Sequence, residues 1–439
     1  TTGPNYGIRA PYSTEIQVLN NTIVANEYGI VVSSSFKSTI NQNNISGRIY
    51  YCGIDFSSSD SSTVTKNYIE RTSGNGNTHT WQYLINGDNS EGSLIRKDTL
   101  LFEGNSDYMY NNMDLRCENS QVDSNYIVTS HSRYEHYVIY DDDASKIKNN
   151  YISVKTYDLW GTRFLIRTNN STSDDSVVVA NNNISVYNPN SYSPFDWVIV
   201  NYGARSYTYN NIINIAQNYA NNGIYSSGMN SKTYGNQLTG QINGTSFGIY
   251  SDSTEVYSNT VNSTSGGTFV NVSGGRSGVL VYKNKFYSTS NTRMLSVNNS
   301  DVKAYLNLFE GNNGRCIQYE NQGIGQIYNN TLVSSSGDYG VYQSNQTNVP
   351  VYNNILQGFT NGIYVENTIA NYNLANNLLW DISGNAFGGT ALPPLAGQMI
   401  DENANGNTSD IYNNIYFDPL FVHPDTNNYN IQAGSPAVN

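Results

Sequence analysis

Four ionisable residues in the middle of the sequence are of the types that acid–base chemistry on an acidic sugar polymer requires: Asp114, Arg116, His136 and Arg163. β-Elimination from a uronic acid polymer needs a cation, either Ca²⁺ or Arg, that neutralises the substrate carboxylate, and a base that removes the C5 proton. These residues are catalytic candidates by type alone, because no His-Glu-x-x-His motif and no familiar lyase signature surrounds them. Hydrolysis by two carboxylates is a less favoured alternative.

An aromatic set in the same region could bind a ligand together with Arg116. Its members are Tyr83, Tyr137, Phe164 and Trp197. Ring faces stack on the C–H faces of sugars, and polar neighbours fix the hydroxyl groups. Alternatively, long loops of the chain or another protein subunit cover this set, because so apolar a patch is unusual on a soluble monomer. The sequence leaves both interpretations open.

The acidic run Asp141, Asp142 and Asp143 could bind Ca²⁺, which takes carboxylate and carbonyl oxygens at a turn. No EF-hand spacing is present, and neighbouring residues on a strand point to opposite sides. A solvated turn is therefore the favoured interpretation of this run. Apart from possible Ca²⁺, the sequence predicts no cofactor.

The composition bounds the fold and the partners. The 439 residues carry 13 % charged residues and 38 Tyr, which favours β-structure with many turns over disorder or helix. A net charge of −12 argues against a nucleic-acid partner. No apolar run approaches the roughly 18–20 residues of a membrane span, so no membrane insertion is expected. A polysaccharide or glycan, or another protein subunit, is the expected partner.

A short repeat runs through most of the chain. Its element Tyr-x-Asn-x-aliphatic predicts turn anchors 23 residues apart at Asn284, Asn307, Asn330, Asn353 and Asn376. Earlier anchors, among them Asn210, are spaced more loosely, and the gap between Asn67 and Asn125 fits a degenerate anchor near Leu100. A last anchor is predicted at Asn413. Units this short cannot form a core alone, but they can do so by stacking into a solenoid.

These repeats resemble the right-handed parallel β-helix of the pectate-lyase-like superfamily. The resemblance implies an all-β solenoid of about sixteen coils, in which the coil Asn residues stack into an amide ladder. Residues 1–380 would form the coils, and residues 381–439 an irregular excursion, a last coil and a closing segment of the same domain. That segment, with Phe417-Asp-Pro-Leu-Phe421 and Gly434-Ser-Pro-Ala437, is similar to the end of secreted β-helix proteins of the Bacteroidetes type.

Alignment of the Gly-aliphatic strands gives one column that is aliphatic in every coil, which predicts the solenoid interior. This column contains Leu84, Val138, Leu165 and Val198. Its flanking residues should point outward, because side chains alternate along a strand. The predicted outward residues are the aromatic set and Ile85, Ile139, Ile166 and Ile199. A shift of one residue would exchange inside and outside.

The function that the sequence favours is a non-catalytic rod, extracellular or at the cell surface, for adhesion, fibre assembly or carbohydrate binding. The later, regular coils offer almost no ionisable side chains for chemistry. The alternative is a polysaccharide lyase, or less readily a hydrolase, which would use the irregular central coils and act on an acidic polysaccharide.

Overall fold

The computed structural model describes residues 5–438 except 73–81, 104–110, 118, 132–134, 142–144, 157–162, 170–175, 188–195, 217–221, 291, 313, 346, 348 and 367–372. For residues 82, 103, 111–115, 131, 135, 136, 156 and 163 it describes the strand but not the side chain. The chain divides into two compact units, residues 1–232 with 236–241 and residues 233–235 with 242–439. Each unit is a parallel β-solenoid, and the described strands complete about 13 turns, slightly fewer than the sixteen coils predicted.

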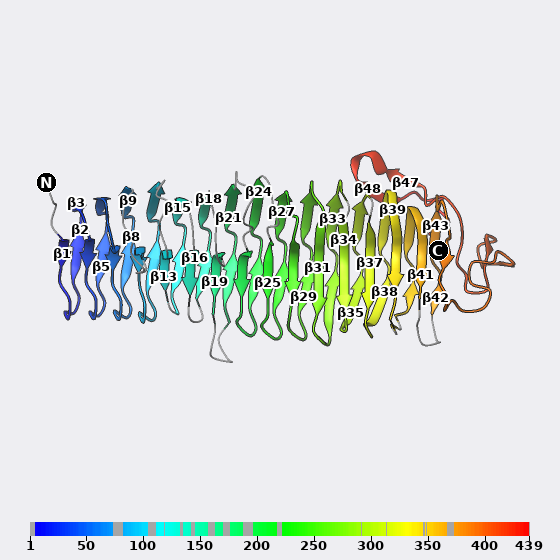
Figure 1. Cartoon of the computed structure of the whole chain (residues 1–439), viewed down its shortest axis with the longest axis horizontal. Helices are drawn as coiled ribbons and strands as arrows, with labels where there is room; N and C mark the ends of the chain where they lie inside the picture. The colour runs from blue at the N-terminus through cyan, green and yellow to red at the C-terminus, as the bar shows by residue number, and fades with distance from the viewer. Residues whose placement is uncertain are drawn as a thin grey trace. The chain divides into compact units, whose positions relative to one another are not determined.

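Each coil of unit 1 contributes one strand to each of three parallel rows (Figure 1). The first row is β2 (Gln17–Leu19), β5 (Thr39–Asn41), β8 (Thr63–Thr65), β11 (Leu94–Arg96), β14 (Gln121–Asp123), β17 (Lys146–Lys148), β20 (Val178–Ala180) and β23 (Tyr207–Tyr209). The second is β3 (Thr22–Ala25), β6 (Asn44–Gly47), β9 (Tyr68–Thr72), β12 (Thr99–Glu103), β15 (Tyr126–His131), β18 (Tyr151–Thr156), β21 (Asn183–Tyr187), β24 (Ile212–Ala216) and β27 (Gln237–Gly240). The third is β1 (Tyr6–Arg9), β4 (Tyr28–Val31), β7 (Cys52–Asp55), β10 (Gln82–Asn86), β13 (Asn111–Cys117), β16 (Glu135–Asp141), β19 (Arg163–Thr168), β22 (Trp197–Asn201) and β25 (Ile224–Ser226).

Unit 2 repeats this arrangement, and strand β26 (Lys232–Tyr234) lies at the division between the units. Its first row is β29 (Glu255–Tyr257), β32 (Val279–Tyr282), β35 (Asp301–Tyr305), β38 (Ile324–Tyr328), β40 (Val351–Tyr352) and β42 (Leu374–Ala375). Its second row is β30 (Thr260–Ser263), β33 (Lys285–Ser288), β36 (Leu308–Gly311) and β43 (Leu378–Trp380), and its third is β28 (Thr245–Ile249), β31 (Gly267–Ser273), β34 (Thr292–Asn298), β37 (Arg315–Glu320) and β44 (Phe387–Gly388). Strands β39 (Thr331–Gln343) and β41 (Ile355–Val365) extend through both of these rows.

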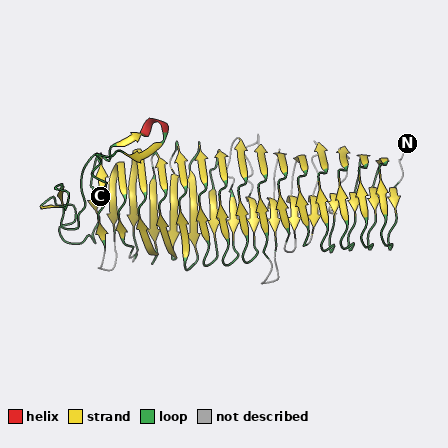
Figure 2. Cartoon of the chain, turned by 180° about the vertical axis from the view of Figure 1, so that it is seen from behind, coloured by secondary structure: helices red, strands yellow, loops and turns green. Residues whose placement is uncertain are grey.

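The C-terminal part of unit 2 leaves the solenoid rows. It contains β45 (Asp401–Glu402), β46 (Thr408–Ser409), β47 (Phe421–His423), the short 3-10 helix η1 (Pro424–Thr426) and β48 (Asn428–Ile431). Figure 2 shows this helix among strands and loops. Strands β47 and β48 form an antiparallel pair. The assignment of residues 381–439 as the closing segment of one domain stays a prediction.

An asparagine ladder joins the coils of unit 1 at the turn between the first and second rows. The Oδ1 atom of Asn43 accepts hydrogen bonds from the backbone N–H and the Nδ2 of Asn21, both at 3.0 Å. Its rungs are Asn21, Asn43, Asn67, Asp98, Asn125, Asn150, Asn182, Asn211 and Asn236. The degenerate anchor predicted near Leu100 is Asp98. Between β23 and β24 the rung is Asn211, one residue after the predicted anchor Asn210.

The ladder of unit 2 has the same geometry, with rungs at Asn259, Asn284, Asn307, Asn330, Asn354, Asn377 and Asn414. The prediction of Asn353, Asn376 and Asn413 was wrong by one residue, because each of these precedes its rung and has left-handed φ. The last rung, Asn414, donates both its backbone N–H and its Nδ2 to the buried carboxylate of Asp410.

In four strands of the third row of unit 1, the residue predicted to point inward is buried as predicted, but strand pairing places the next residue in the aligned column. Parallel pairing aligns Ile54, Ile85, Leu115, Ile139, Ile166 and Ile199. Ile85, Ile139, Ile166 and Ile199 are therefore fully buried rather than outward. The residues before them, Leu84, Val138, Leu165 and Val198, are also buried, but the pairing skips them. Two successive inward residues break the simple alternation of a strand.

Candidate functional site

The third row of unit 1 carries an arginine among aromatic rings. The guanidinium carbon of Arg167 lies 5.4 Å from the ring centre of Phe164 and 5.5 Å from that of Tyr140. It also lies 5.7 Å from the ring centre of Tyr137 and 5.4 Å from that of Tyr202. Each distance is within the range of a cation–π interaction. We call these five residues the Arg167 cluster.

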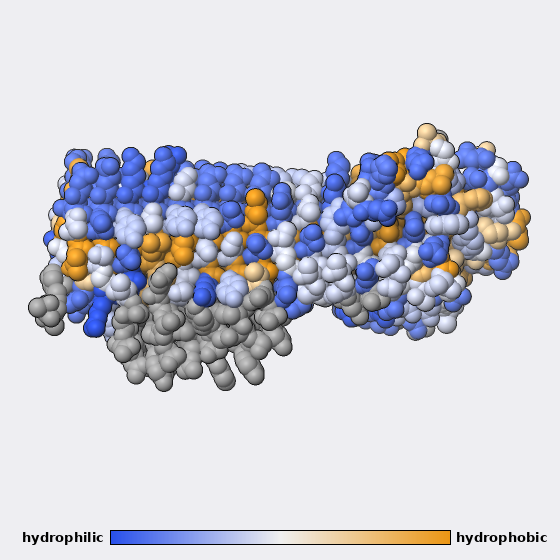
Figure 3. Space-filling view, turned by 90° about the horizontal axis from the view of Figure 1, so that it is seen from above, coloured by the Kyte–Doolittle hydropathy of each residue, from blue (hydrophilic) through white to orange (hydrophobic). Residues whose placement is uncertain are grey.

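Strand register brings the Arg167 cluster together. Pairing of β16, β19 and β22 aligns Tyr137 with Phe164 and Phe164 with Trp197, and it aligns Tyr140 with Arg167. Tyr137 and Phe164 are only 6 % and 7 % exposed, and they form a buried core with Val200. The half-buried rings of Tyr83, Trp197 and Tyr225 pack against this core. On the face of the molecule drawn in Figure 3, apolar residues gather in a row next to hydrophilic rows.

The charge of Arg167 is not balanced by an acidic partner among the residues that the structure describes. Its Nη1 donates to the Tyr137 hydroxyl at 3.1 Å, and its buried Nε has no hydrogen-bond partner. A buried donor without a partner is costly, so this guanidinium is poised to bind an acceptor. The cation–π contacts hold it in place without neutralising its charge.

Arg116 lies in the same column of the sheet, two strands from Arg167, and its surroundings differ. Its Nη2 forms an ion pair of 2.7 Å with Asp88. The guanidinium of Arg116 donates a hydrogen bond to the Tyr83 hydroxyl. Burial raises the pKa of this hydroxyl above its usual value, although Arg116 opposes the shift. The structure thus places Tyr83 and Arg116 beside the Arg167 cluster, with the charge of Arg116 committed to Asp88.

Two of the predicted catalytic residues are neighbours by strand register. His136 on β16 pairs directly with Arg163 on β19. Asp114 lies at a position of β13 that the pairing skips. The side chains of His136, Arg163 and Asp114 lie outside the described part of the structure, so the backbone alone places these residues on adjacent coils.

Of the acidic run Asp141–Asp143, Asp141 lies among the residues that the structure describes. Asp141 is fully buried at the end of β16, and its carboxylate accepts hydrogen bonds from the Oγ of Ser145 at 2.6 Å and from its backbone N–H at 3.2 Å. Asp142 and Asp143 lie outside the described residues. No group of three or more His, Cys, Asp or Glu that could hold a metal ion occurs among the residues described. Asp141 thus has a local structural role.

The first part of the chain matches a family model. Residues 1–112, about a quarter of the chain, match the model of the NosD family, described as periplasmic copper-binding protein (NosD). This family has a right-handed β-helix of the pectate-lyase-like fold. A search of curated proteins finds no match. The chain is a parallel β-helix protein, and residues 1–112 are similar to a family of the pectate-lyase-like fold. In the described residues of this β-helix protein, no helix is long and apolar enough to cross a membrane.

Stacked tyrosines along the first row of unit 2 are a second aromatic feature of the β-helix protein. Neighbouring rings from Tyr234 to Tyr352 lie 4.8 to 5.2 Å apart with interplanar angles of 2° to 7°. Because each ring covers the face of the next, the row presents ring edges and hydroxyls to the solvent. This row is therefore less suited to stacking on sugars than the Arg167 cluster.

The sequence predicted Tyr83, Tyr137, Phe164, Trp197 and Arg116 as a ligand-binding set, and these residues lie within or beside one cluster. The predicted outward direction was wrong for Tyr137 and Phe164, which are only 6 % and 7 % exposed. Their role in binding stays a prediction. The sequence analysis missed three members of the Arg167 cluster: Tyr140, Arg167 and Tyr202. Tyr140 and Arg167 follow the true inward residues Ile139 and Ile166, so the correct register would have pointed to them. No spacing in the sequence marks Tyr202.

Proposed function

We propose that this β-helix protein binds an acidic glycan, without cleaving it, outside the cytoplasm. The observation that supports this function is the uncompensated charge of Arg167, held among four aromatic rings. A guanidinium binds a carboxylate or sulfate with two parallel hydrogen bonds. The half-buried rings of Tyr140 and Tyr202 next to it provide surface for the C–H faces of the sugar, whereas Tyr137 and Phe164 are buried beneath. Adhesion to a glycan-coated surface would follow from such binding.

The charge of the whole chain makes a cationic site selective. Because the net charge is −12, acidic polymers are repelled from most of the surface. An anionic glycan can therefore bind only where a local cation outweighs this repulsion. Arg167 provides this charge, whereas Arg116 shares its charge with Asp88 at 2.7 Å.

Copper binding, which the name of the matched family states, fits this chain poorly. Copper sites are built from Cys, Met and His ligands. In the described part of residues 1–112, the available thiol is that of Cys52, which is buried and donates to the Ile54 carbonyl at 3.1 Å. Burial raises the pKa of this thiol well above its ordinary value, which opposes formation of a thiolate ligand. We therefore do not propose copper as a cofactor.

A binding measurement tests the proposed function. Isothermal titration of the whole chain with oligogalacturonate should show binding that weakens as salt rises. Arg167→Gln should reduce the affinity at least tenfold. The matched control is Arg293→Gln, because Arg293 is an exposed arginine on β34 of unit 2. Equal affinity of the parent and Arg167→Gln would contradict the proposal.

A polysaccharide lyase is the second candidate function, supported by the register of β16 and β19. The direct pairing of His136 with Arg163 puts a base and a cation on adjacent strands. A lyase would release unsaturated uronate products, which absorb in the ultraviolet. A screen of acidic polysaccharides with the parent and with His136→Ala tests this function, and no product from the parent would exclude it for those polymers.

A further inference from the structure

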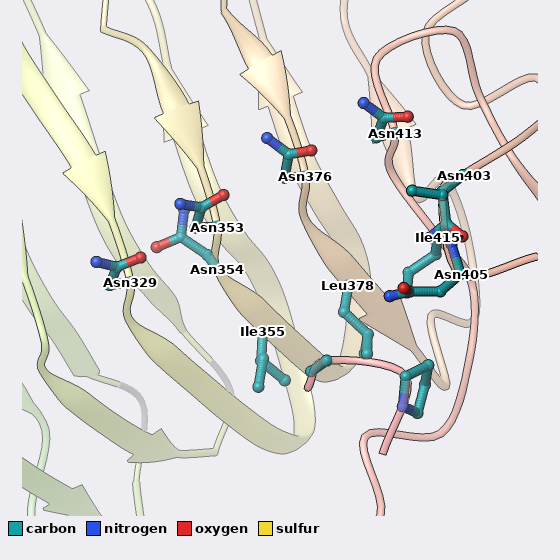
Figure 4. Close-up of a pocket in the computed structure, with 13 residues that line it drawn as sticks. Asn329, Asn353, Asn354, Ile355, Asn376, Leu378, Asn403, Asn405, Asn413 and Ile415 are labelled. Atoms are coloured by element: carbon teal, nitrogen blue, oxygen red, sulfur yellow. Dashed lines mark hydrogen bonds between the residues drawn. The ribbon is translucent and has the colours of Figure 1, made fainter. Parts of the chain in front are cut away.

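A cleft in unit 2 lies outside the site described above. Its volume is about 640 Å³, within the usual range for small-ligand sites. Figure 4 shows it between the turns that precede β41 and β43 and the chain of the C-terminal segment. One wall carries the exposed residues Asn329, Asn353, Asn376 and Asn413.

These four asparagines form a regular row on successive coils. Each has left-handed φ, from 54° to 62°. The backbone N–H of Asn353 donates to the Ala375 carbonyl at 3.1 Å, and that of Asn376 donates to the Tyr412 carbonyl at 3.0 Å. Asn329 likewise donates to the Tyr352 carbonyl at 3.3 Å, so each of the first three residues of the row is bonded to the residue just before the next member. Neighbouring members are about one strand spacing, ~4.8 Å, apart.

The conformation of the turn does not by itself require asparagine. Three earlier coils of unit 2 place Ser258, Lys283 and Leu306 at the same position with φ of 53° to 56°. Within unit 2, the row of four asparagines begins where the cleft begins. The side-chain amides of Asn353 and Asn376 have no hydrogen-bond partner among the described residues, so they can bind a ligand. Asparagine thus gives the cleft both donors and acceptors.

The rest of the cleft is uncharged. Half-buried Ile355 provides apolar surface, Leu378 and Ile415 line the cleft at only 3 % and 5 % exposure, and Pro436 and Ala437 of the C-terminal segment complete the lining. None of the residues that line the cleft is titratable. A charged ligand would find no counter-charge here, whereas a neutral molecule with many hydroxyl groups would find amides for its hydroxyls and apolar surface for its C–H groups.

We propose that this cleft binds an uncharged oligosaccharide in an extended conformation, with one asparagine amide per sugar ring. The spacing supports this arrangement, because one strand spacing is close to the length of one pyranose ring. The site is independent of the Arg167 cluster, since it lies in the other unit and uses no charge. The protein would then have one site for an acidic glycan and another for a neutral one.

Isothermal titration of the whole chain with cellohexaose, xylohexaose and mannohexaose tests the proposal. The double variant Asn353→Gly/Asn376→Gly removes two amides but keeps the turn, because glycine adopts positive φ without strain. It should weaken binding of the preferred hexasaccharide at least tenfold. The matched control is Asn181→Gly/Asn210→Gly, which changes the same turn position in unit 1, where φ is 56° and 53°.

The outcomes are distinct. Weakened binding in the cleft variant, with parental affinity in the unit 1 control and in Arg167→Gln, would support the neutral site. Absence of binding to all three hexasaccharides by the parent would overturn it, and so would parental affinity in the cleft variant. Circular dichroism melting of the variants shows whether they are folded. Failure of the oligogalacturonate titration would affect only the Arg167 cluster.

Discussion

Asp98 accepts two hydrogen bonds from Asn67, one from the backbone N–H at 2.7 Å and one from Nδ2 at 2.9 Å, in a ladder whose adjacent rungs are asparagines. An asparagine at this rung would donate its Nδ2 to the preceding coil and to the next rung, as Asn67 does with the Ile40 carbonyl and Asp98. The buried Oδ2 of Asp98 has no partner. A proton on Oδ2 would restore a donor where an asparagine has one.

The ladder should therefore depend on pH through Asp98. Burial raises the pKa of Asp98 to about 7, although the hydrogen bonds from Asn67 oppose this shift. The folded state binds this proton more tightly than the unfolded state, so its stabilisation is complete below about pH 4 and is lost as the pH rises to about 7. The loss should be at most about 4 kcal/mol.

Asp98→Asn tests this dependence. The variant should melt at a higher temperature than the parent at pH 8 and at nearly the same temperature at pH 4, measured by circular dichroism. Asp338→Asn is the matched control, because Asp338 is exposed. A variant that melts below the parent at pH 8 would show that the carboxylate is preferred at this rung.

The unit 2 ladder should lose stability when one rung is removed. Asn307 accepts two bonds from Asn284 and donates Nδ2 to the Val281 carbonyl and to Asn330. Asn307→Ala leaves buried groups without partners, at a cost of roughly 2–4 kcal/mol. Asn329→Gly, at an exposed turn position, should change the unfolding free energy by less than about 0.5 kcal/mol. Equal effects in urea unfolding would contradict the role of the ladder.

Close contact between coils should make Gly53 sensitive to a methyl group. A Cβ on Gly53 would lie 2.6 Å from the Leu84 carbonyl oxygen and 2.8 Å from Cγ2 of Ile69. Gly53→Ala should therefore destabilise unit 1 by about 1–3 kcal/mol. Gly434→Ala is the control, because no atom lies within 4 Å of its Cβ position. An unchanged melting temperature of Gly53→Ala would mean that the coils separate easily.

The C-terminal segment should loosen when Tyr429 is changed. The Tyr429 hydroxyl is hydrogen-bonded to Glu310 on β36, and its ring packs on Phe421 with 5.1 Å between centres. Tyr429→Ala removes both contacts and should speed limited proteolysis of residues 416–438 several-fold. Tyr412→Phe, which removes a single bond to the Pro394 carbonyl, is the milder comparison. Equal cleavage rates would show that other contacts hold the segment.

The sequence predicted the solenoid because the repeat spacing sets the stacking of the coils. It did not determine the register to one residue. In Asn353-Asn354 both residues fit a turn, and only the pairing of β39 with β41 shows that Asn354 is the rung. Leu84-Ile85 poses the same problem, because either residue can fill the interior. Arg167 was missed for this reason, since its outward direction follows from the position of Ile166.

Asp410 gives the asparagine ladder a definite end. Its carboxylate accepts hydrogen bonds from the Nδ2 of Asn414 and from the backbone N–H groups of Gly397 and Tyr412. Because the Asp410 side chain has no N–H group, it cannot pass the pattern of amide bonds to a further coil. A neighbouring molecule therefore cannot extend the ladder by amide hydrogen bonds at this rung. This disfavours polymerisation of the folded protein through its ladder.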